Sequence, residues 1–93
     1  MSTSLHDRQP LSNEQIAATL EELAGELESQ GANPYRTNAY RNGAIVVRQW
    51  HRPVSELLHQ EGTEGLMDLP GIGSSLAGAI LSGIPRIRGV RPR

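Results

Sequence analysis

The 93-residue chain has no cysteine, no phenylalanine and no lysine, and its few aromatic rings include Tyr35, Tyr40 and Trp50. Without cysteine it forms no disulfide and no thiolate or cysteine-rich zinc site, which is typical of an intracellular protein. Because lysine is absent, all nine basic residues are arginines. An arginine guanidinium stays protonated and cannot act as an amine nucleophile. The sequence therefore excludes chemistry that needs a lysine or a cysteine side chain.

Long apolar runs are also missing, and no segment alternates apolar and polar residues for the length of a convincing strand. The N-terminus has no apolar stretch for export or membrane insertion, so we expect a cytoplasmic protein without a membrane partner. Leucine and alanine, which supply much of the apolar content, favour helices. We predict one all-α domain of four to five short helices at residues 11–83. A flexible N-terminus at 1–10 and an extended, mobile basic tail at 84–93 would flank it.

The first predicted helix has strong start signals. Ser12 and Gln15 have the spacing of a capping box, and Leu11 can pack on Ile16 as a hydrophobic staple. Gly31 suits the C-terminal cap. One face carries an apolar stripe and the opposite face is acidic. The stripe consists of Ile16, Leu20, Leu23 and Leu27, and the acidic residues are Glu14, Glu21, Glu22, Glu26 and Glu28. We interpret the acidic face as solvent-exposed.

The second helix should start at Pro34, after Asn33 as N-cap, and run to about Trp50. From residue 33 to residue 52 there are four arginines and no acidic residue. Arg41 and Arg48 lie seven residues apart and so share a face, whereas Arg36 lies four residues before Tyr40. Because the whole chain has a net charge of −1, a run with only positive charges favours contact with phosphate. An ordinary solvent face is the alternative.

Three helical segments are predicted in the second half of the chain. The first spans 54–60 and ends before Gly62, the second is a short helix at 63–68 with Thr63 as N-cap, and the third runs from Ser74 to about Ser82. A turn with the sequence Leu-Pro-Gly-Ile-Gly, at residues 69–73, separates the last two. The order is therefore short helix, glycine turn, helix.

This glycine turn has the features of a phosphate-binding site. Gly71 and Gly73 can adopt backbone angles closed to other residues, and they carry no side chain that would hold a ligand away. The amides from Gly73 to Ser75 begin a helix and have no intrahelical acceptor. The partial positive charge of a helix N-terminus favours an anion at the same place. The alternative is a tight turn that only joins two helices.

The turn and its flanking helices resemble a helix-hairpin-helix motif, which holds a DNA backbone through its hairpin amides. The segment from Asn33 to Ala44, followed about 25 residues later by Leu-Pro-Gly-Ile-Gly, resembles the N-terminal lyase-type domain of the X-family DNA polymerases. It also resembles small bacterial proteins that carry this domain without a polymerase. The resemblance covers roughly residues 11–82. It implies binding to DNA with little sequence preference, including gaps and 5′-phosphate ends, in DNA repair.

The resemblance also implies which residues form the site. Arg36 and Tyr40 fall where the family holds a 5′-phosphate, and Tyr35 falls where a ring stacks on a template base. Packing of Tyr40 in the core is the alternative. The matching hairpin residues are Gly71, Ile72, Gly73 and Ser74, and Ser75 falls where the family often has a second phosphate-binding lysine. If Arg36, Arg41 and Arg48 hold phosphates beside the one in the hairpin, the logarithm of affinity should fall with that of salt at a slope of roughly −3 to −4.

The same resemblance implies a monovalent cation at the hairpin. The backbone carbonyls of Met67, Leu69 and Ile72 match those that hold such an ion in related hairpins. An oxygen-only ligand set suits K⁺ or Na⁺. No other cofactor is expected.

Enzymatic activity is not expected, although the resemblance raises the question. In the family a lysine after the hairpin attacks an abasic sugar and forms a Schiff base, and its position is occupied here by Ala79. We therefore predict a DNA-binding module without lyase activity. Two alternatives stay open. One is a protein-interaction module that uses the acidic first helix, and the other is a remnant of a repair lyase that uses its terminal amine.

Overall fold

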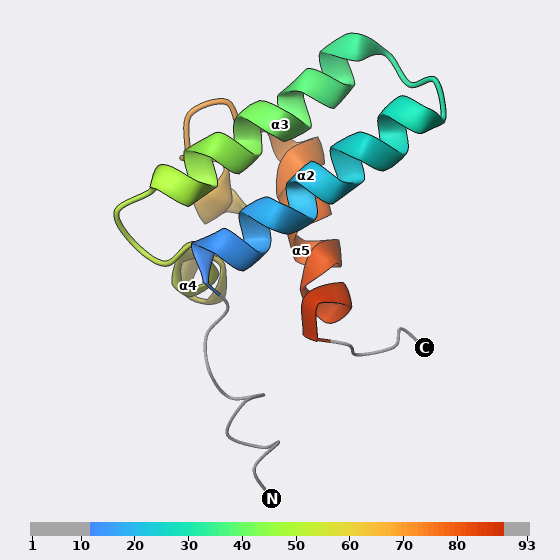
Figure 1. Ribbon diagram of the computed structural model, residues 1–93. Helices are drawn as coiled ribbons and strands as arrows, with labels where there is room; N and C mark the ends of the chain where they lie inside the picture. Colours follow the sequence, from blue (N-terminus) through green and yellow to red (C-terminus); the bar gives the residue numbers. More distant parts are fainter. Residues whose placement is uncertain (1–11, 89–93) are drawn as a thin grey trace, which may run out of the picture.

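Four helices make up the part of the chain that the computed structural model describes, namely the backbone of residues 12–88 and the side chains of residues 12–83. They are α2 (Asn13–Ser29), α3 (Pro34–Gln49), α4 (Val54–Leu66) and α5 (Ser74–Arg88). Helices α2 and α3 form an antiparallel pair, and α5 crosses behind them (Figure 1). Residues 12–88 contain no strand, and the predicted all-α class is confirmed. The predicted flexible N-terminus, 1–10, and the staple residue Leu11 lie outside the described residues.

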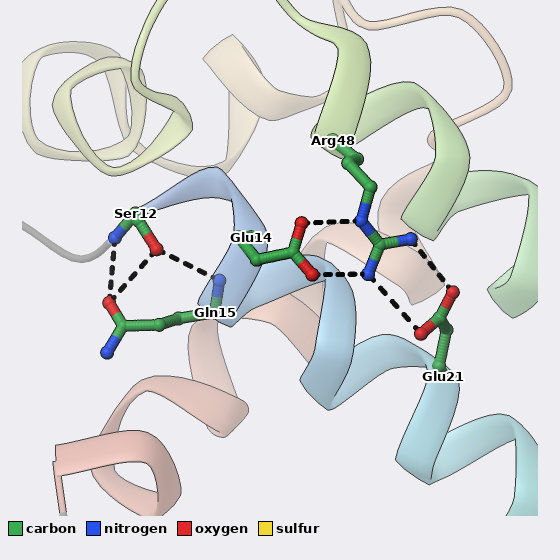
Figure 2. Close-up of polar contacts among 5 residues, drawn as sticks. All are labelled: Ser12, Glu14, Gln15, Glu21 and Arg48. Carbon is green, nitrogen blue, oxygen red and sulfur yellow. Dashed lines mark hydrogen bonds and ion pairs between the residues drawn. The ribbon is translucent and has the colours of Figure 1, made fainter.

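Local side-chain caps start both members of the antiparallel pair, as the sequence predicted. The Ser12 amide donates to Gln15 Oε1 at 2.9 Å, and the Gln15 amide donates to Ser12 Oγ at 3.0 Å (Figure 2). Before α3, the Tyr35 amide donates to Asn33 Oδ1 at 2.8 Å, with Pro34 in the first turn. A cap of this kind contributes about 1 kcal/mol. Gly31, with a φ of 76°, follows the end of α2.

The core lies among α2, α3, α4 and α5, and one glycine decides how closely α5 approaches α3. Ile16 and Leu20 of the predicted stripe are buried there. A Cβ atom added to Gly43 would lie 2.5 Å from Leu76 Cδ2, which is closer than packed atoms allow. The missing side chain at Gly43 therefore lets the first turn of α5 pack directly on α3. This contact brings the glycine turn beside the N-terminal half of α3.

Asn13 ties the loop before α4 to the start of α2. Its Oδ1 accepts a hydrogen bond from the Val54 amide at 2.7 Å, and its Nδ2 donates to the carbonyls of Arg52 at 2.9 Å and Trp50 at 3.3 Å. Pro53, the N-cap of α4, makes no side-chain cap. Asn13 therefore supplies from a distant part of the chain the cap that the local sequence lacks.

The two remaining helices differ from the prediction in length. Gly62, with a φ of 70° and a ψ of −162°, interrupts α4 at the predicted boundary between two helical segments. Helix α5 continues to Arg88, well past the predicted end at Ser82, so residues 84–88 are helical rather than extended. Gly83 is buried against α2, where an added Cβ would lie 3.0 Å from Thr19 Cγ2. This packing stabilises a helical turn that Gly83 would disfavour by its low helix propensity. Residues 89–93 of the predicted tail lie outside the described residues.

Candidate nucleic-acid interface

The glycine turn is anchored in the core by its apolar residues. Leu69 and Ile72 are buried, and the Ile72 amide donates to the Leu69 carbonyl at 3.1 Å. Gly71 lies between them with a φ of 77°, in the left-handed region that favours glycine. The Ile72 amide is therefore used within the turn and is not offered to a ligand.

The amides that follow the turn are unused. The Gly73 carbonyl accepts a hydrogen bond from the Ala77 amide at 2.9 Å, which makes Gly73 the N-cap of α5. Among the hydrogen bonds of residues 12–88, none is donated by the amides of Gly73, Ser74 or Ser75. All three residues are exposed. Three backbone donors thus face solvent at the positive end of a helix, as the sequence predicted.

Nothing in the fold requires glycine at position 73. Its φ is not in the left-handed region, and an added Cβ would meet no atom within 4 Å. The absent side chain instead leaves open space beside the unused amides. This space is what a phosphate needs in order to reach the backbone.

An open pocket of about 470 Å³ lies between the glycine turn and α3. Its lining includes five residues that the sequence predicted as site residues, which are Arg36, Tyr40, Gly71, Gly73 and Ser75. Ala39 and Leu76 complete the lining and were not predicted as site residues. Leu76 fits the apolar spacing of the core, and Ala39 has no functional group that would attract attention. Their place in the pocket lining follows only from the packing of α5 on α3.

Tyr40 both packs in the core and faces the pocket. It is 7% exposed and belongs to the buried apolar cluster, while it also lines the pocket beside the turn. No hydrogen bond of the described residues uses its hydroxyl. Packing of Tyr40 in the core is therefore shown, whereas its contact with a 5′-phosphate stays a prediction. Tyr35, in the same first turns of α3, is 87% exposed and lies outside the pocket lining.

A comparison with protein families agrees with this geometry. The profile of the Helix-hairpin-helix domain family matches residues 11–82. The chain belongs to this family. Helix-hairpin-helix domains commonly bind DNA without sequence specificity. Comparisons with curated proteins and with solved structures found no match. Over the described part of this helix-hairpin-helix chain, no helix combines the length and the apolar character needed to cross a bilayer.

Two predicted arginines of the helix-hairpin-helix domain lie away from the pocket, in ion pairs with α2. The Arg48 guanidinium sits between two carboxylates, with Nε 2.7 Å from Glu14 Oε1 and Nη1 2.9 Å from Glu21 Oε2 (Figure 2). Arg41 Nη2 lies 2.8 Å from Glu28 Oε1. The acidic face of α2 is therefore not only a solvated surface, because three of its carboxylates hold two of the three arginines of α3.

These contacts shift the proton affinities of the groups involved. Hydrogen bonds from Arg48 lower the pKa of Glu14 and of Glu21 below the ordinary value of 4.5. Hydrogen bonds from Glu14 and Glu21 raise the pKa of Arg48 above its ordinary value. All three groups are thus held in their charged forms at neutral pH.

The period of the helix explains why the arginines of α3 separate. Each residue turns an α-helix by about 100°, so Arg36 and Tyr40 lie about 40° apart. By the same rule Arg41 and Arg48 lie about 140° and about 120° round the helix from Arg36. The hairpin packs along one face of α3, which we call the hairpin edge, and α2 packs along another face. Of the three arginines of α3, only Arg36 lies on the hairpin edge.

The carbonyls predicted to hold a cation lie in and beside the turn. The Leu69 carbonyl already accepts the Ile72 amide, and no described backbone hydrogen bond outside the helices ends on the carbonyls of Met67 or Ile72. These oxygens fit the ligand type that a hard monovalent ion prefers. Within the described residues, histidine and acidic side chains form no cluster of three that could hold a metal. The K⁺ or Na⁺ site remains a prediction.

Proposed function

We propose that this helix-hairpin-helix domain is a non-enzymatic module that binds the DNA backbone with little sequence preference, through the hairpin amides and Arg36. The observation that carries the proposal is the pocket lined by Arg36 together with Gly73 and Ser75, two residues whose amides are unused. Amides and one guanidinium are suited to the oxygens of a phosphate.

Binding would work by combining three contributions. A phosphate oxygen accepts hydrogen bonds from the amides of residues 73–75, where the helix N-terminus adds a favourable partial charge. Arg36 neutralises the phosphate charge, and the bare Gly73 permits the close approach. Because phosphates are the same at every base pair, these contacts position the domain without reading sequence.

The finer proposal concerns DNA ends and gaps. A phosphate at a 5′ end is more exposed than one within a duplex, and the open pocket with Tyr40 and Arg36 in its lining would accommodate it. Tyr35 is exposed nearby and has a free ring face for stacking on an unpaired base. These features support the likeness to the N-terminal domain of X-family polymerases, with a role at repair intermediates. A bound K⁺ or Na⁺ would add positive charge beneath the phosphate.

The proposed lack of lyase chemistry rests on the side chains of the chain. The chain has no lysine, and Ala79, at the position of the family's reactive lysine, is half-buried against the core. Only the terminal amine could form an imine. We expect no borohydride-trapped adduct with DNA that contains an abasic site. A covalent adduct would show that the terminal amine is reactive and would refute this part of the proposal.

A titration with DNA, followed by amide NMR, tests the binding mode. We expect shifts at residues 73–75 and around Arg36, larger for gapped DNA with a 5′-phosphate than without it. Arg36→Gln should weaken binding and make the salt slope about 0.9 less negative. Arg52→Gln is the control, because Arg52 follows the end of α3 remote from Arg36 and is not among the residues that line the pocket.

No shifts at low salt would overturn the proposal, as would shifts confined to α2. The ion pairs on α2 and α3 reduce the free positive charge of the surface, which favours a protein-interaction module as the second candidate. Shifts confined to α2 upon addition of a protein partner, without any response to DNA, would support that candidate.

A further inference from the structure

Three carboxylates of α2 occupy two of the four arginines that make residues 33–52 so basic. We propose that Glu14, Glu21 and Glu28 confine DNA contact to the hairpin edge of α3 by holding Arg41 and Arg48 in ion pairs. These glutamates would set how many phosphates the domain engages. The inference rests on the proposed binding of DNA.

The contacts of Arg48 leave its guanidinium little capacity for phosphate. Its Nε and Nη2 donate to the two oxygens of Glu14 at 2.7 and 3.0 Å, and its Nη1 donates to Glu21 at 2.9 Å. All three nitrogens therefore already bind carboxylate oxygens (Figure 2). A phosphate would have to displace two carboxylates to reach this side chain.

Arg36 has no such competitor. Within the described residues it takes part in no ion pair, and it lines the pocket beside the hairpin. The difference affects binding because salt dependence arises when a cationic side chain neutralises a phosphate and releases its counterions. An arginine that is already neutralised by a carboxylate adds nothing to this term. The domain should therefore respond to salt less steeply than its run of arginines suggests.

The test measures duplex DNA affinity against salt for the full chain and for the triple variant Glu14→Gln, Glu21→Gln, Glu28→Gln. Freeing two arginines should make the slope about 1.8 more negative. The fall in affinity between about 50 and about 200 mM salt should then be about twelvefold larger than in the wild type. Adding Arg41→Gln and Arg48→Gln to the triple variant should restore the wild-type slope, whereas the same two changes in the wild type should leave it unaltered.

The control separates ion-pair release from a general change in net charge. Glu56→Gln, Glu61→Gln and Glu64→Gln remove the same charge from exposed positions on α4 and should leave the slope unchanged. If the triple variant unfolds, the single Glu28→Gln change frees only Arg41 and should make the slope about 0.9 more negative.

Three results would count against the inference. A slope that is the same in the wild type and in the folded variants refutes it while leaving hairpin binding intact. An equal steepening in the α4 control attributes the effect to net charge and also refutes it. If neither the wild type nor the variants bind DNA at low salt, both this inference and the proposed function are wrong.

Discussion

Replacing Gly73 by aspartate should change stability and DNA binding in opposite directions. Gly73 is the N-cap of α5, and the amides of residues 73–75 have no acceptor within the described residues. An added Cβ meets nothing within 4 Å, so the side chain fits without strain. Its carboxylate would accept hydrogen bonds from the free amides and place a negative charge where the phosphate is proposed to bind.

The size of both effects can be estimated from these contacts. Aspartate caps a helix better than glycine by a few tenths of a kcal/mol, and its charge near the helix N-terminus adds about 0.3–1 kcal/mol. Glycine also has more backbone freedom to lose on folding. We expect the free energy of unfolding to rise by about 0.5–1.5 kcal/mol. Loss of one charge-assisted hydrogen bond to phosphate costs about 1.5–3 kcal/mol, so DNA affinity should fall at least about tenfold.

Urea denaturation followed by circular dichroism, together with fluorescence titration of labelled DNA, measures both quantities. Gly25→Asp is the matched control, because Gly25 lies on α2 with equally open space and receives the same charge away from the pocket. Gly73→Asn provides a cap without the charge. Wild-type affinity in Gly73→Asp would refute phosphate binding by the hairpin amides. A loss of stability would refute the conclusion that these amides are free to be capped.

Two further predictions concern the contacts that hold the helices together. Asn13→Ala should lower the free energy of unfolding by about 2 kcal/mol, because it removes three hydrogen bonds to residues 50–54. Asn42→Ala, at an exposed position of α3, is the control and should leave the free energy of unfolding nearly unchanged. Equal effects of the two substitutions would refute the role of Asn13. The pKa values of Glu14 and Glu21 are lower in the folded state than in the unfolded state. The ion pairs of these two glutamates with Arg48 therefore stabilise the protein above about pH 4.5, and this stabilisation is lost as the pH falls. The stability difference between the wild type and Arg48→Gln should therefore shrink in acid, and a difference that is constant with pH, measured by urea denaturation, would contradict this.

The features that sequence predicts well are those decided within one turn of the chain. The capping box at Ser12 and Gln15, the Asn33 cap and the break at Gly62 depend on neighbours a few residues away, and each appears where predicted. The left-handed conformation of Gly71 is equally local. Such contacts are set by backbone geometry, which the residue types report directly.

Features that depend on the packing of distant helices could not be predicted in this way. Asn13 caps a helix that begins 41 residues later, and Gly43 matters only because Leu76 packs against it. The end of α5 is a similar case, since packing of Gly83 on Thr19 extends a helix that the local sequence would end. Residue type alone gives no indication of these partners.

The arginines of α3 show how the same limit affects a functional interpretation. In the sequence, Arg36, Arg41 and Arg48 form one basic run, and counting them suggests a broad phosphate-binding surface. The helix period places them on two edges, and the neighbouring helix then decides which charge is available. The carboxylates of α2 neutralise Arg41 and Arg48, whereas Arg36 faces a hairpin that has donors and no carboxylate. On the proposed function, the arginines of α3 available to DNA are therefore those that α2 leaves unpaired, and this is Arg36 at the hairpin.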